Sequence, residues 1–207
     1  MRTLELATPH GPARAHLRPL AAPRAALLLG HGAGGGPGAP DLVAAAAAAE
    51  AQAIRVVLVE QPYRVAGRQA PAPAAQLDAA WTAAVARLRE AELGNLPLLV
   101  GGRSSGARVA CRTAAATGAA GVLCLAFPLH PPGRPEQSRL PELDGVTVPV
   151  LVVQGERDPF GLPPAAPGRQ VVTVRGDHGL KADLPAVAAA VGTWLAGLAA
   201  GPGRPRA

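Results

Sequence analysis

Ser104 lies at the point where a short apolar segment changes into an alanine-rich one, with Gly102 and Gly106 two residues to either side. In a strand–turn–helix, this G-x-S-x-G spacing exposes the serine hydroxyl on a sharp turn, where larger neighbours would collide. The helix that follows directs free N–H groups toward the serine. The spacing also fits an ordinary Gly/Ser turn, so the interpretation of Ser104 as a nucleophile depends on its partners.

A serine hydroxyl becomes a nucleophile when a histidine takes its proton and a carboxylate orients that histidine. His178 follows the last predicted strand, from where its imidazole can reach back over the sheet to Ser104. Asp158 follows the preceding strand and is the expected carboxylate, with Glu156 and Asp177 as competitors. Alternatively, the aspartate starts a turn and the histidine is an ordinary loop residue. The order serine, aspartate, histidine at successive strand ends favours a catalytic triad.

Acyl transfer also needs N–H donors for the oxyanion that forms on the carbonyl. The backbone N–H of Ser105 is one candidate, because it follows the nucleophile. The glycine-rich loop Gly30–Gly36 supplies the other, with Ala33 preferred and Gly34 next. A phosphate-binding interpretation of this loop is disfavoured, since it lacks both the Lys-Ser/Thr ending and the dinucleotide spacing.

We expect an open substrate pocket walled by residues 60–68 and 127–135. Arginines there would suit an anionic acyl group. The alternative is that these arginines pair with acids such as Glu60 and hold the loops. Four side chains are predicted to meet in the pocket: Tyr63, Arg64, Arg103 and His130.

These residues need a sheet that brings strand ends together. An antiparallel hairpin is expected over 3–7 and 13–18, and 60–73 and 127–144 are expected to be loops. The pattern predicts one domain over 1–200, with a mostly parallel sheet, helices on both faces and no large lid domain. The Pro/Gly-rich tail 201–207 is expected to be disordered. Strands are predicted at 25–29, 54–59, from 98 to the turn at Ser104, and at 121–126, 148–154 and 171–174. Helices are predicted at 41–53, 74–92, from the turn at Ser104 to about 117, and at 183–198.

Composition narrows the classes of partner. The net charge is +6, but the arginines are scattered and aromatic residues make up 2% of the chain, which disfavours nucleic-acid binding. Cys111 and Cys124 lie in expected core elements without metal-ligand spacing, so neither a metal nor another cofactor is expected. No signal-peptide pattern or bilayer-length apolar segment is found, so we expect a cytoplasmic protein that does not bind membranes.

Four segments resemble a compact α/β-hydrolase group that includes testis-expressed protein 30-like proteins and is related to dienelactone-hydrolase-like families. The resemblance covers nearly the whole chain. It implies that Ser104, Asp158 and His178 occupy the triad positions. The sequence departs from the group at Ser105, where methionine is more usual. The segments are Gly30–Gly35, Gly101–Arg108, Phe127–Gly133 and Gly176–Gly179.

The expected function is therefore hydrolysis of small carboxylic esters or thioesters through an acyl-enzyme, with a small-molecule substrate. Some members of the resembling group act in complexes rather than as enzymes. The alternative is a non-catalytic binding or interaction module built on the same fold.

Overall fold

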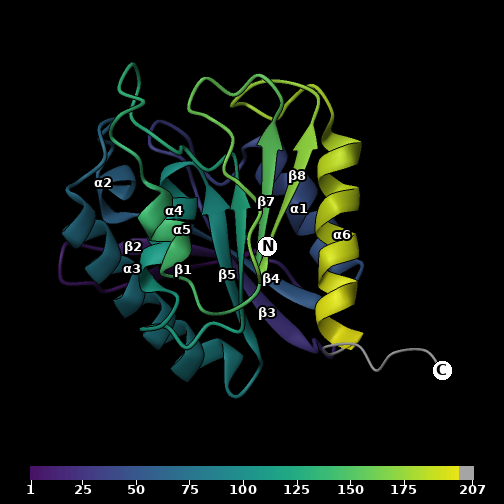
Figure 1. Ribbon diagram of the computed structural model, residues 1–207. Coiled ribbons are helices and arrows are strands. Elements are labelled where there is room, and N and C mark those ends of the chain that lie inside the picture. The colour runs from purple at the N-terminus through teal and green to yellow at the C-terminus, as the bar shows by residue number, and fades with distance from the viewer. Residues whose placement is uncertain (201–207) are drawn as a thin grey trace.

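The computed structural model describes residues 1–200 and is built around an eight-stranded sheet in the order β1-β2-β4-β3-β5-β6-β7-β8 (Figure 1). β1 pairs antiparallel with β2, and β2 with β4, whereas all other neighbours are parallel. This confirms the predicted sheet and hairpin. The strands are β1 (Arg2–Leu6), β2 (Ala13–Leu17), β3 (Ala25–Gly30), β4 (Ile54–Glu60), β5 (Leu98–Arg103), β6 (Gly121–Leu125), β7 (Val150–Gly155) and β8 (Arg169–Val174).

Helices cover both faces of the sheet, as predicted. In Figure 1, α6 stands on one side of the sheet and α3, α4 and α5 on the other. α1 packs beside α6, and α3 packs beside α4. The helices are α1 (Pro40–Glu50), α2 (Pro62–Val65), α3 (Ala74–Leu88), α4 (Ser105–Thr113), α5 (Leu140–Asp144) and α6 (Leu184–Ala200), and a π-helical turn, η1 (Arg89–Leu93), extends α3.

The sheet separates two apolar cores because successive strand side chains point to opposite faces. In β3, Leu27 and Leu29 face α1 and α6, whereas Leu28 faces α3 and α4. All three leucines are buried, which is why β3 is a continuous apolar run rather than an alternating one. On the side of Leu27 and Leu29, α1 contributes the fully buried Ala45, Ala46 and Ala49 to the core.

Two segments predicted as loops contain short helices, α2 and α5. Pro62 begins α2 and Pro141 is the second residue of α5, positions where the fixed φ of proline favours a helical start. The helix predicted to reach residue 117 ends at Thr113 instead. No lid domain interrupts residues 1–200, and none of their helices is long and apolar enough to cross a membrane. The predicted tail 201–207 lies outside the described residues.

Candidate active site

Ser104 occupies a sharp turn between β5 and α4, with φ 52° and ψ −108°. A non-glycine residue rarely adopts a positive φ, and such strain is typical of functional sites. Two close backbone approaches explain the flanking glycines. A Cβ atom on Gly102 would lie 2.5 Å from the Gly30 carbonyl oxygen, and one on Gly106 would lie 2.4 Å from the same oxygen.

The three predicted triad side chains form one hydrogen-bonded chain. The Oγ atom of Ser104 lies 2.9 Å from Nε2 of His178, and Nδ1 of His178 lies 2.8 Å from Oδ2 of Asp158. A proton on Nδ1 is donated to the carboxylate, which leaves Nε2 to accept the serine proton. The geometry is that of a nucleophile, a base and an orienting acid, whereas the catalytic roles stay a prediction.

The Asp158 carboxylate is buried and held by two further donors. The backbone N–H of Phe160 donates to Oδ1 at 2.9 Å, and Nε2 of Gln154 donates to Oδ2 at 2.9 Å. Neither competing carboxylate takes this position. Glu156 is exposed, and Asp177 accepts the backbone N–H of Gly179. Neither Gln154 nor Phe160 was identified from the sequence.

His178 is held from its backbone and from one ring neighbour. Nη2 of Arg103 donates to the His178 carbonyl oxygen at 2.8 Å, and the Phe160 ring meets the imidazole edge-on with centroids 4.4 Å apart. Arg103 also forms an ion pair with Asp41, with Nε 2.9 Å from Oδ2. Burial raises the pKa of Asp41, and Arg103 opposes that shift. The sequence offered no signal for Asp41.

The loop after β3 passes directly beside the nucleophile. A Cβ atom on Gly32 would lie 3.6 Å from Cβ of Ser104. The Gly32 carbonyl oxygen accepts the Gly35 N–H at 3.1 Å and the His31 Nδ1–H at 2.8 Å. The Gly32 carbonyl and the Ala33 N–H belong to the same trans peptide, in which the two groups point in opposite directions. Because the carbonyl points toward the His31 ring, the Ala33 N–H points away from it.

Two buried side chains fix this loop. Nε2 of His31 accepts the Gln61 N–H at 3.1 Å, so Nδ1 carries the proton of the neutral ring. Burial lowers the pKa of His31, which keeps the imidazole neutral. The Tyr63 hydroxyl donates to the Ala33 carbonyl oxygen at 2.8 Å, and burial raises the pKa of Tyr63 to about 12. At neutral pH the phenol therefore remains a donor.

The residues predicted to bind substrate have intramolecular partners. Tyr63 and Arg103 make the bonds described above, so Arg103 holds Asp41 and His178 rather than pairing with Glu60. Nη1 of Arg64, in α2, donates to the Arg68 carbonyl and to the side chain of Gln69, both just after that helix. Nδ1 of His130 lies 2.9 Å from the Pro131 carbonyl oxygen. Substrate contact by these four residues stays a prediction.

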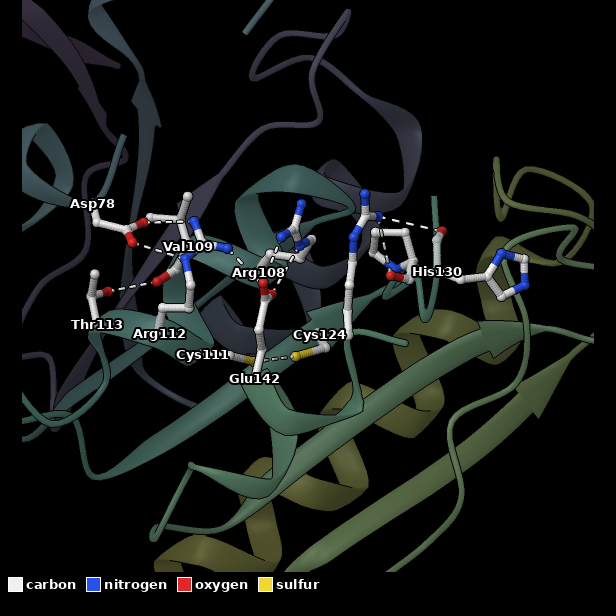
Figure 2. A network of polar contacts seen from close by, with 11 residues as sticks. Asp78, Arg108, Val109, Cys111, Arg112, Thr113, Cys124, His130 and Glu142 are labelled. Atoms are coloured by element: carbon white, nitrogen blue, oxygen red, sulfur yellow. Dashed lines mark hydrogen bonds and ion pairs between the residues drawn. The ribbon is translucent and has the colours of Figure 1, made fainter. Parts of the chain in front are cut away.

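A charged network braces α4, the helix that begins just after the nucleophile (Figure 2). Nη2 of Arg112 pairs with Asp78 of α3 at 2.7 Å, and Nε of Arg108 donates to Glu142 of α5 at 2.9 Å. Arg112 also reaches Glu142 at 3.2 Å, so one carboxylate joins both arginines. These partly buried bonds fix one side of α4 against α3 and α5.

Beneath this network, α4 and β6 meet through two thiols (Figure 2). The sulfur atoms of Cys111 and Cys124 lie 3.4 Å apart, and both residues are free and buried. The hydrogen bond with Cys111 and burial raise the pKa of Cys124. A protonated, enclosed thiol behaves as a small apolar side chain, so this pair contributes packing.

Residues 23–182 match the family model described as "Alpha/beta hydrolase domain", so the chain belongs to the α/β-hydrolase family. Solved structures share this fold. A lidless α/β serine hydrolase from Xanthomonas campestris is 21% identical with a TM-score of 0.77, covering 99% of this chain and 96% of that one. A dienelactone hydrolase from Anabaena variabilis is 16% identical with a TM-score of 0.74, covering 95% and 96%.

An esterase domain of a Rhodothermus marinus protein is 14% identical with a TM-score of 0.67, covering 94% of this chain and 96% of that one. No curated protein matches the chain. The family and the fold thus agree with the resemblance to dienelactone-hydrolase-related proteins, while similarity to testis-expressed protein 30 in particular stays a prediction. At these identities the structural neighbours define the fold, and function has to be argued from the site.

Proposed function

We propose that the protein is a serine hydrolase of small carboxylic esters or thioesters. The observation that carries the proposal is the continuous hydrogen-bonded chain from Ser104 through His178 to Asp158. Two of the similar structures, a dienelactone hydrolase and an esterase domain, are named for the hydrolysis of such bonds. No lid domain interrupts residues 1–200, which fits a small substrate that enters an open site.

In the proposed reaction, His178 takes the Ser104 proton as Oγ attacks the carbonyl carbon. The N–H groups of Ser105 and Ala33 hold the oxyanion, and Asp158 stabilises the imidazolium. His178 then passes its proton to the leaving alcohol or thiol, which leaves an acyl group on Oγ. Water, deprotonated by the same histidine, releases the acid and restores the serine.

The test is steady-state hydrolysis of a panel of 4-nitrophenyl esters and acyl thioesters. We expect Ser104→Ala and His178→Ala to lower kcat by about 10³-fold or more, without a matching loss of stability. Ser138→Ala and His10→Ala change the same residue types at exposed positions and are the controls. Equal activity in Ser104→Ala and wild type would rule the proposal out.

A further inference from the structure

A small hollow lies behind the loop that follows β3, beneath the first turn of α4. The end of β3, the segment leading into α2, and α3 form its other walls. It has space for about one water-sized group. The residues that matter here are His31, Gln61, Leu77, Trp81, Ser105 and Val109.

Two buried polar atoms in this wall have no hydrogen-bond partner within residues 1–200. They are Oε1 of Gln61 and Nε1 of Trp81, on residues that are 6% and 1% exposed. Nε2 of Gln61 donates to the Leu77 carbonyl at 3.2 Å, which fixes Oε1 as the acceptor. The indole nitrogen is a donor only. Buried polar atoms without partners are uncommon, so a donor and an acceptor on two residues that line one hollow call for a polar guest there, a water or a ligand group.

The other polar side chains of the wall are already engaged. Both ring nitrogens of His31 have backbone partners, and the Tyr63 hydroxyl is bonded to Ala33. The hollow thus offers a guest one donor and one acceptor, surrounded by Leu77 and Val109. A hydroxyl group accepts and donates at once, whereas a methyl group does neither, a carboxylate cannot donate and an ammonium cannot accept.

The hollow also adjoins the proposed reaction centre. Ser105, whose N–H we expect to hold the carbonyl oxygen, belongs to its wall, and so does His31, which orients the peptide before Ala33. The hollow therefore lies next to the proposed oxyanion donors.

We infer that this hollow receives the hydroxyl of a short hydroxyacyl group and thereby selects that acyl group. The substrate hydroxyl accepts from Nε1 of Trp81 and donates to Oε1 of Gln61. This inference rests on the proposed function, because it names the acyl part of the same substrate. A water molecule offers the same chemistry as the hydroxyl, so the experiment has to distinguish a trapped water from a substrate group.

Binding is tested without turnover in ¹⁵N-labelled Ser104→Ala protein. The chain has two tryptophans, so its spectrum contains two indole N–H signals, which Trp194→Phe assigns. We expect methyl glycolate and methyl 3-hydroxypropionate to shift the Trp81 signal, and methyl acetate and methyl propionate to leave it in place. The Trp194 signal, from α6, is the internal control. The inference is overturned if the hydroxy esters and the unsubstituted esters shift the Trp81 signal equally, or if neither pair shifts it. Either result would mean that the hollow holds water only.

Turnover gives a second measurement. We expect wild type to prefer the hydroxyacyl member of matched 4-nitrophenyl esters by about 10- to 100-fold in kcat/KM. Trp81→Phe and Gln61→Met, which keep the shape but lose the polar atom, are each expected to reduce that preference about tenfold, whereas Trp194→Phe keeps it. Ester hydrolysis without preference overturns the inference alone. A Trp81 response without hydrolysis of any ester overturns the proposed function and leaves the hollow as a hydroxyl-binding site.

Discussion

Replacing Arg103 with methionine probes how the loop carrying His178 is held. Arg103 is the ion-pair partner of Asp41, whose side chain is fully buried, and it also donates to the His178 carbonyl. Arg103→Met leaves Asp41 as a buried carboxylate without its cation. Removing one partner of a buried pair costs about 3–5 kcal/mol of unfolding free energy, which in a chain of this size lowers Tm by about 6–20 °C.

The dependence of this loss on pH has a definite sign. Burial already raises the pKa of Asp41, and loss of Arg103 raises it further. A carboxyl whose pKa is raised in the folded state stabilises the fold at low pH, and that stability is lost as pH rises through the raised pKa. The cost of Arg103→Met is therefore expected to be larger at pH 7 than at pH 5.

Thermal and urea unfolding of three variants at both pH values tests this account. The double variant Arg103→Met/Asp41→Asn removes the unpaired charge and is expected to recover most of the loss. Arg2→Met breaks the exposed pair with Glu92 and is expected to cost less than about 1 kcal/mol. Equal destabilisation of the single and double variants, or the same loss at pH 5 and pH 7, would show that an unpaired Asp41 charge is not the cause.

Three further predictions concern the turn that carries Ser104, the loop that follows β3 and the triad. Gly106→Ala is expected to cost at least about 1–3 kcal/mol in urea unfolding because its Cβ would meet backbone, whereas Gly192→Ala, which meets nothing within 4 Å, is expected to be neutral or stabilising. Burial lowers the pKa of His31 from 6.5, so the folded protein binds fewer protons and stability falls below about pH 6.5. His31→Asn should reduce the slope of unfolding free energy against pH by up to about 1.4 kcal/mol per pH unit. An unchanged slope would show that His31 is not the group responsible. Gln154→Leu removes a donor to Asp158 and is expected to lower kcat about tenfold with KM little changed, while an unaltered kcat would show that this bond is dispensable.

The strands and the turn that carries Ser104 could be predicted because their signals are local. Apolar runs mark the strands, and the glycines flanking Ser104 are required by contacts within one turn. The aspartate and the histidine could be placed because parallel strands end at the same edge of the sheet.

Contacts that depend on where a side chain turns were not predictable. Arg103 stands in the elbow motif, yet nothing local indicates that it reaches Asp41, 62 positions earlier in the chain. Likewise, the sequence does not indicate that Gln61 and Trp81 each bury a polar atom without a partner. That result depends on how two distant segments pack together. Long-range pairing of side chains is set by the tertiary fold, which motif spacing does not specify.

An activated Ser104 reacts covalently with a fluorophosphonate, and this labelling is the first measurement to make. Intact-mass and peptide spectra of folded wild type are expected to show one adduct, located on Ser104. The adduct should be absent from Ser104→Ala and His178→Ala and retained in Ser138→Ala. Folded wild-type protein that stays unlabelled, or an adduct that persists in Ser104→Ala, would contradict the account.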